Sequence, residues 1–141
     1  MLSYVAQEGY HLRNVKIHPD GHIAALAGQD GTIRIWDIMG QSQVAEIKAH
    51  QGGIDSLNFS ENGINFATGS YADKTVKLWD LRNLEDGNFK MVQQNAGGVV
   101  NFDQFGQFLA VGTNSVRLYN VKDLSEFGRI DGHKDAITSI Q

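Results

Sequence analysis

A repeat of about 42 residues constrains this chain more than any other feature. Trp36-Asp37 and Trp79-Asp80 end two similar segments in which apolar and basic residues alternate, and 43 positions separate the two tryptophans. A third copy ends on Tyr119-Asn120, a further 40 positions along the chain. A fixed period of this size is typical of folds that stack one small supersecondary unit many times. The period therefore predicts the fold, and the function has to be sought on the surface of that fold.

A second marker, a turn that ends in glycine, recurs with the same period. Gly21, Gly63 and Gly106 are separated by 42 and then 43 residues. Glycine permits the positive φ that such turns require. Short runs of alternating apolar and polar residues flank each turn, which is the pattern of half-buried β-strands. Four short antiparallel strands in about 42 residues make one blade of a β-propeller.

The chain is therefore predicted to be all-β, with about three four-stranded blades of a larger ring. A ring covers the apolar faces of its blades, so an open face of roughly 500 Å² would forfeit about 12 kcal/mol. We expect the remaining blades or other chains to cover these faces, either because the chain is a piece of a longer protein or because copies or partners complete it. The expected organisation is an outer strand of a preceding blade at 2–6, blades at 12–48, 53–93 and 98–131, and the first strand of a next blade at 135–141.

Composition narrows the classes of partner. The net charge is −4 and the acidic and basic residues are interleaved, so direct binding to nucleic acid is not expected. The chain has no cysteine, which excludes disulfides and thiolate metal sites and fits an intracellular protein. No stretch is long and apolar enough to span a bilayer, so no membrane partner is predicted.

The Trp-Asp ends and the spacing of the turns resemble the WD-repeat family along nearly the whole chain. In that family a Trp indole, a strand Ser or Thr, a His and a turn Asp form hydrogen bonds in series, because a buried indole N–H needs an acceptor. The first repeat keeps Asp30 and Trp36 but has Leu26 at the hydroxyl position. The second repeat offers all four groups, although its turn is one residue longer: His50, Thr68, Asp73 and Trp79.

A narrower resemblance is to the C-terminal propeller of the pre-mRNA-processing factor 19 family. It implies a seven-bladed propeller in the nucleus that recruits partners or substrates for a spliceosome-associated U-box E3 ubiquitin ligase involved in pre-mRNA splicing. In that family the U-box and a coiled coil precede the propeller, and nothing in this chain corresponds to them. The resemblance thus implies a scaffold that binds proteins of a splicing and ubiquitin-ligase complex, without ubiquitin transfer by these residues. The segments that carry it are 18–21, 59–63, 76–82, 102–104 and 108–112.

One rim of the propeller is the candidate binding surface. The loops that join successive blades and the middle turn of each blade lie on the same rim. Tyr and Arg side chains contribute most of the binding energy at many protein interfaces. Any single one of these positions is also compatible with an ordinary solvated loop. The candidate rim residues are Tyr10, His11, Arg13, Gln29, Gln51, Tyr71 and Gln94.

The sequence carries no catalytic signature, so no cofactor, no metal and no enzymatic activity are predicted for this chain. It has no Gly-x-Ser-x-Gly elbow, phosphate-binding loop or dinucleotide-binding glycine motif. His50 and Asp73 can be interpreted as a general base and its orienting carboxylate, but the repeat explains their spacing as a structural network. His18 and His22 flank a turn with Asp20 and suggest at best a weak, adventitious metal site.

Two other interpretations remain open from the sequence. The first is a WD-repeat scaffold of an unrelated complex. The second is an enzyme with its site in the central channel of the propeller. The inner strands offer that channel mainly four polar side chains, which contain no obvious pair of nucleophile and base: Lys16, Ser56, Asn58 and Asn101.

Overall fold

The computed structural model describes residues 12–84, 89–94, 98–104, 106–112 and 115–130. Within these ranges the chain forms twelve β-strands and no helix, and hence no helix that could cross a membrane. The strands are β1 (Leu12–Ile17), β2 (Ile23–Gly28), β3 (Thr32–Asp37), β4 (Ser42–Lys48), β5 (Ser56–Phe59), β6 (Asn65–Ser70), β7 (Thr75–Asp80), β8 (Phe89–Gln94), β9 (Val99–Phe102), β10 (Phe108–Gly112), β11 (Val116–Asn120) and β12 (Glu126–Ile130).

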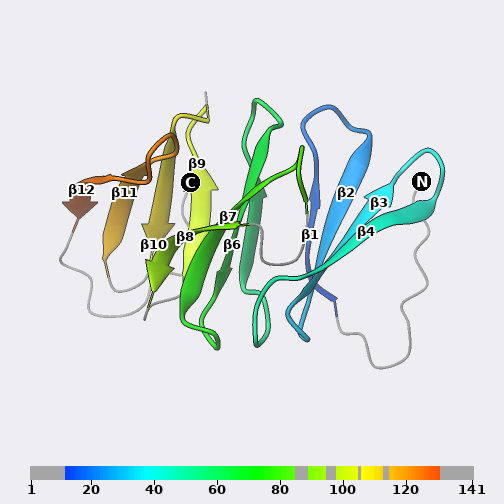
Figure 1. The fold of residues 1–141 in the computed structure, drawn as a ribbon, viewed down its shortest axis with the longest axis horizontal. Helices are drawn as coiled ribbons and strands as arrows, with labels where there is room; N and C mark the ends of the chain where they lie inside the picture. Colours follow the sequence, from blue (N-terminus) through cyan, green and yellow to red (C-terminus); the bar gives the residue numbers. More distant parts are fainter. Residues whose placement is uncertain (1–11, 85–88, 95–97, 105, 113–114, 131–141) are drawn as a thin grey trace.

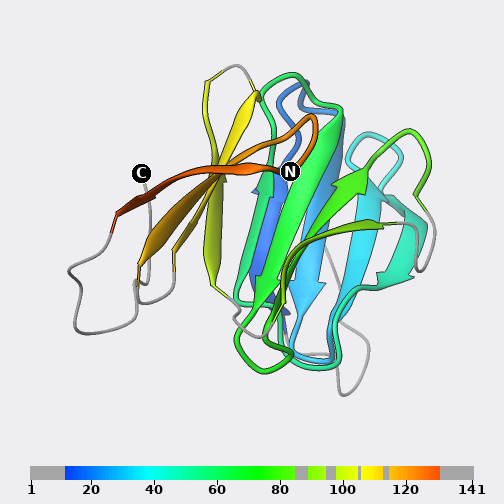
Figure 2. The ribbon, with the colours of Figure 1, turned by 60° about the vertical axis from the view of Figure 1, so that its left-hand side comes forward.

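The strands form three four-stranded antiparallel sheets, each built from four strands that are consecutive in the sequence. The sheets stand side by side with their faces together, like neighbouring blades of a propeller (Figure 1). The view in Figure 2 shows the twist that carries each sheet from its inner to its outer strand. The prediction of an all-β, bladed architecture is confirmed. The strands expected at 2–6 and 135–141 lie outside the described residues.

In each blade, the repeated glycine turn joins the first strand to the second. Gly21, Gly63 and Gly106 have φ angles of 77°, 75° and 72°, which is the left-handed region that favours glycine. Each turn is closed by a backbone hydrogen bond to the residue three positions earlier, from Gly63 N to Ser60 O at 3.0 Å in the second blade. The innermost strand and its neighbour are thereby joined with the same register in successive blades.

The apolar cores lie between the sheets, so the middle sheet is buried on both faces. In β7, the side chains of Val76 and Leu78 belong to the core shared with the third sheet, whereas Trp79 belongs to the core shared with the first. The Trp79 ring stacks on that of Phe66 at a centroid distance of 6.0 Å. Ala67, on the opposite face of β6, lets the third sheet approach closely. Strand β6 is consequently buried along nearly its whole length.

Two blades approach each other closely at Gly69 of β6. A Cβ atom at this position would collide with the carbonyl oxygen of Gly98, just before β9. The Gly69 carbonyl accepts a hydrogen bond of 2.9 Å from the backbone N–H of Asp55. Glycine is therefore required here by contact with the neighbouring backbone, since its φ is not in the left-handed region.

We predict that Gly69→Ala destabilises the protein by about 2–3 kcal/mol, because backbone atoms of the next blade have to move. Urea unfolding followed by tryptophan fluorescence measures the change. Gly40→Ala is the matched control, since its added methyl group meets only side-chain atoms, chiefly the flexible carboxylate of Asp37, and its cost should stay below about 1 kcal/mol. Equal losses of stability in the two variants would contradict the assigned contact.

Candidate functional site

A chain of hydrogen bonds joins four side chains inside the second blade. The Trp79 indole N–H donates to Thr68 Oγ1 at 3.0 Å. The Thr68 hydroxyl lies 2.7 Å from His50 Nε2, and His50 Nδ1 lies 2.9 Å from Asp73 Oδ2. His50, Thr68 and Trp79 are almost fully buried. The structure thus brings together the four residues of the second repeat that the sequence singled out.

The donor at one end, Trp79, and the acceptor at the other, Asp73, fix the direction of these hydrogen bonds. An ionised carboxylate only accepts, so His50 Nδ1 carries the proton and donates to Asp73. His50 Nε2 then accepts from the Thr68 hydroxyl, whose oxygen accepts from Trp79. This arrangement needs a neutral imidazole. Burial lowers the pKa of His50 and outweighs the opposing effect of Asp73.

The carboxylate of Asp73 is stabilised by several donors. Burial alone would raise the pKa of Asp73, but hydrogen bonds from His50, Thr75 and the backbone of Gln51 lower it. The Thr75 hydroxyl donates to Asp73 Oδ2 at 2.8 Å, and its oxygen lies 3.0 Å from His50 Nδ1. The sequence analysis did not single out Thr75, although Thr32 occupies the same place in the first repeat.

The longer turn of the second repeat is accommodated at Lys74. Its φ of 60° takes the left-handed place that Gly31 holds in the first blade with a φ of 84°. The backbone N–H of Asp73 donates to Ser70 Oγ at 3.1 Å, which closes the turn. The extra residue therefore leaves the Asp73 carboxylate within reach of His50.

The first and third blades lack this series of groups. Asp30 accepts a 3.0 Å hydrogen bond from the backbone of Thr32, and Trp36 is half-buried beside a β2 strand that carries Leu26. Tyr119 replaces the tryptophan in the third blade and is buried in the core between the second and third sheets. The network is therefore a structural feature of the second blade, and nothing about it requires a ligand.

A second cluster forms on the rim, where two predicted residues meet through a third. Arg13 Nη2 lies 3.0 Å from Asp55 Oδ1, and the backbone N–H of Tyr71 donates to Asp55 Oδ2 at 2.7 Å. Asn14 Nδ2 donates to the Asp55 carbonyl at 3.1 Å. The side chains of Arg13 and Tyr71 stay about 40% accessible. We call Arg13, Asp55 and Tyr71 the rim cluster.

The rim cluster combines a charged pair, Arg13 and Asp55, with the neutral hydroxyl group of Tyr71. Burial and the nearby Asp55 carboxylate raise the pKa of the Tyr71 hydroxyl, so it remains a neutral donor. Gln29 and Gln51 are exposed in neighbouring turns. Tyr10 and His11 lie outside the described residues, as does the side chain of Gln94, whose backbone ends β8 opposite Thr75.

The polar groups of the inner strands link neighbouring blades. Asn58 Nδ2 donates to Asn101 Oδ1 at 2.9 Å, and Ser56 Oγ accepts from the backbone N–H of Val100 at 2.9 Å. Lys16 is exposed on β1. None of these hydrogen bonds within the described residues joins a nucleophile to a base. The geometry therefore gives no support to a catalytic centre in the channel.

His18 also acts between blades. Its Nε2 lies 2.8 Å from the carbonyl oxygen of Gly63, and its ring meets Phe59 edge-on. Asp20 lies within 2.9 Å of His18 Nδ1 and 3.4 Å of His22 Nδ1. Nε2 of His18 is therefore already occupied by a hydrogen bond to the second blade. Across the described ranges, no three His, Asp or Glu side chains are grouped closely enough to hold a metal ion.

We predict that Thr68→Val destabilises the protein by about 2–4 kcal/mol, because it leaves the buried donor of Trp79 and the acceptor of His50 without partners. Chemical unfolding of both proteins measures the difference. Thr32→Val removes a hydroxyl of the same size from the first blade, where no side-chain hydrogen bond is lost, and should cost less than about 1 kcal/mol. A small effect of Thr68→Val would show that the series of hydrogen bonds contributes little.

The lowered pKa of His50 predicts loss of stability on acidification. In the unfolded chain the imidazole binds a proton near pH 6.5, whereas the folded protein resists that proton to lower pH. The stabilising contribution of His50 is therefore complete above about pH 6.5 and falls below it, by at most about 1.4 kcal/mol per pH unit. Urea midpoints between pH 8 and pH 5 measure this slope.

The matched variants for the acid slope are His50→Gln and His22→Gln. The first should flatten the dependence over this range, and the second, at an exposed position, should keep it. The pKa of Asp73 is lowered in the folded protein, so this carboxyl adds a further loss of stability only in more acidic solution, below its ordinary pKa of 3.8. An unchanged slope in His50→Gln would disprove the assignment to the buried imidazole.

Comparison with known proteins relates the chain to pre-mRNA-processing factors. It is 38% identical over 122 residues to Pre-mRNA-processing factor 19 of Oryza sativa subsp. japonica, covering 84% of this chain and 22% of the rice protein. It is also 38% identical over 148 residues to Pre-mRNA-processing factor 19 of Homo sapiens, covering 99% of this chain and 28% of the human protein. The chain thus spans only about a quarter of the length of these relatives.

Solved structures and the family match agree on the fold. The structure of U3-55K superimposes with a TM-score of 0.81 at 18% identity, covering 93% of this chain and 42% of that one. The crystal structure of the RRP9 WD40 repeats gives the same values. The family described as WD domain, G-beta repeat matches residues 3–37 and 41–80, more than half of the chain. With three blade-like sheets and two Trp-Asp strands, the chain belongs to the WD40-repeat family.

Proposed function

We propose that this chain recruits proteins to a pre-mRNA splicing complex and that the rim cluster is part of the surface that binds them. The proposal is supported by the similarity to Pre-mRNA-processing factor 19 over most of the chain. A WD40 domain of this kind is a scaffold for protein interactions. The observation that carries the choice of surface is the convergence of Arg13 and Tyr71 on one carboxylate, Asp55.

The rim cluster has the chemistry of a protein-binding site. Asp55 engages one nitrogen of Arg13, and the guanidinium keeps further N–H donors for the carbonyl or carboxylate oxygens of a partner. Tyr71 adds an aromatic ring and a neutral hydroxyl at low cost in conformational entropy. Asp55 also holds the backbone of the turn that carries Tyr71, so both side chains are oriented before a partner binds.

The proposed role is recruitment in the nucleus, in a complex with ubiquitin-ligase activity, without transfer of ubiquitin by these residues. The polar groups of the inner strands bond to one another between blades, and the buried His50 bonds to Thr68 and Asp73. The groups in the described ranges that remain available to a partner are therefore at the ends and sides of the blades. Binding is the activity that such an arrangement supports.

The experiment is affinity purification of the tagged chain from nuclear and cytosolic fractions, with partners quantified by mass spectrometry. We expect splicing factors in the nuclear fraction and a decrease of about tenfold or more in their recovery with Arg13→Ala/Tyr71→Ala, because Arg and Tyr anchors carry much of the energy of an interface. Met39→Ala/Glu61→Ala, at exposed positions in turns at the other end of the blades, should retain them.

Two outcomes would reject parts of this proposal. Recovery of a different set of proteins, lost in the same variant, would indicate a WD40 scaffold of an unrelated complex. Recovery of splicing factors that is undiminished by Arg13→Ala/Tyr71→Ala would exclude the rim cluster. Circular dichroism and urea unfolding of the variants separate a lost contact from a lost fold.

A further inference from the structure

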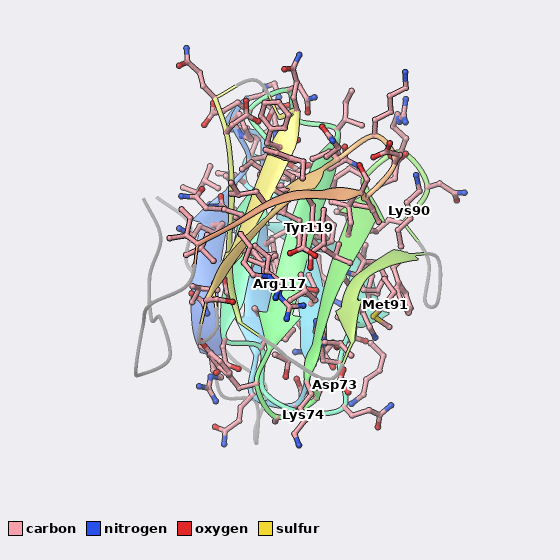
Figure 3. All side chains as sticks on the ribbon, turned by 90° about the vertical axis from the view of Figure 1, so that its left-hand side faces the viewer. Asp73, Lys74, Lys90, Met91, Arg117 and Tyr119 are labelled. Atoms are coloured by element: carbon pink, nitrogen blue, oxygen red, sulfur yellow. The ribbon has the colours of Figure 1, made fainter. Side chains whose placement is uncertain are left out.

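A cleft of about 350 Å³ opens between the second and third blades, at the end of the sheet opposite to the rim cluster. Its wall on the second blade includes Leu78, Asp80 and Lys90, and Val121 and Lys122 close it from the third blade. Asp80 pairs with Asn65 at this end of β6 and β7, whereas Thr75 pairs with Ser70 next to Tyr71 at the other end. Figure 3 shows the separation, with Lys90 far from Asp73 and Lys74.

The third blade has smaller side chains than the second at two positions on the face that meets its neighbour, although Leu124 packs against the core as Leu84 does. Between the first and second blades the corresponding space is filled by large side chains of the second blade, and Leu81 and Leu84 pack at its edge. The third blade has Tyr119 in the place of Trp79, and Val121 two positions later in the place of Leu81. Glu126 lies opposite Tyr119, whereas Phe89 lies opposite Trp79.

The mouth of the cleft is basic. The side chains of Lys90 and Lys122 are exposed, one on each blade. Arg82 forms a bidentate pair with Asp80, with its Nη2 at 2.8 Å and its Nε at 3.0 Å from the carboxylate. These hydrogen bonds lower the pKa of Asp80 to about 2, so the carboxylate is ionised and neutralises one of the three cations. Among the residues that line the cleft, Lys90 and Lys122 therefore leave an excess of positive charge, which the exposed Asp123 beside Lys122 partly offsets.

The lining of the cleft is mixed: Leu78 and Val121 contribute apolar groups, and Asn65 and Asn83 contribute polar ones. Leu78 is almost fully buried in the core between the second and third sheets, and Val121 packs against the same core. A free phosphate ion would gain nothing from the apolar part of this lining, whereas a peptide side chain would bury apolar surface there. The combination of some apolar lining and a basic mouth matches a segment that carries both apolar and acidic groups.

We propose that this cleft is a second binding site, for an acidic peptide segment of a partner protein that inserts one apolar side chain. The apolar side chain lies against Leu78 and Val121, and carboxylates on both sides of it pair with Lys90 and Lys122. Arg82, held by Asp80, adds a fixed donor at the edge. The site is separate from the rim cluster and does not depend on it.

The test uses the 141-residue chain and three short fluorescein-labelled peptides, with binding followed by fluorescence anisotropy. The first has glutamates on both sides of a central leucine, the second has lysines in place of the glutamates, and the third has glycine in place of the leucine. We expect binding of the first peptide, at least about tenfold weaker binding of the other two, and weakening by salt. Failure of the first peptide to bind, or equal binding of all three, would overturn the proposal.

Variants locate the site. Lys90→Glu/Lys122→Glu should weaken binding of the first peptide by about tenfold or more, because two attractive contacts become repulsive. Lys16→Glu/Lys74→Glu makes the same change of charge at exposed positions outside the cleft and should leave binding unchanged. Equal effects of the two double variants would show attraction to the overall charge only and would overturn the assignment to the cleft.

A third variant tests the volume of the cleft and keeps its charge. Val121→Leu restores the residue that the second blade has at this position and narrows the cleft. It should weaken binding of the leucine peptide more than binding of the glycine peptide.

The variant of the rim cluster tests whether the two sites are independent. Arg13→Ala/Tyr71→Ala should bind the first peptide as well as the unmodified chain does, so failure of this site and failure of the rim cluster are distinguishable. Loss of peptide binding in the rim variant would contradict the independence of the two sites.

Discussion

Each blade of this protein is a sheet with two apolar faces, and the need to cover both faces governs the rest of the structure. The second sheet shows the consequence most fully, since β6 is buried between its two neighbours. Close packing of sheets requires small residues where backbones meet, as at Ala67 and Gly69. The stability of any blade is thus a property of its contacts with the next one, as expected for repeat proteins.

Burial on both faces also decides what the polar side chains can do. A buried donor without an acceptor costs free energy, so Trp79, Thr68 and His50 bond in series and end on a carboxylate that is partly accessible. The inner strands meet the same need with bonds between blades, such as that between Asn58 and Asn101. Interior polar groups in the described part are therefore structural, and recognition depends on groups at the ends and sides of the blades.

The sequence was sufficient to predict the structural elements that carry a periodic signal. The tryptophans and the turn glycines predicted four-stranded units, and the structure has them. It was insufficient for Asp55, which lies in a connection without a repeated pattern and contacts Arg13, 42 positions away. Thr75 was missed because family resemblance directed attention to the other four groups. The cleft was missed because it depends on the summed volumes of side chains from two blades, which no single motif records.

The drift of the third repeat links stability to recognition. Exchange of a tryptophan for Tyr119 and of a leucine for Val121 removes apolar contact between the second and third blades, and each such loss weakens that interface. The first interface keeps its large side chains, so the stack retains one well-filled core. Loss of volume alone would leave a cleft with no particular charge at its mouth. Here basic side chains from both blades surround it and one carboxylate fixes Arg82, an arrangement that packing does not require and that binding of an acidic segment explains.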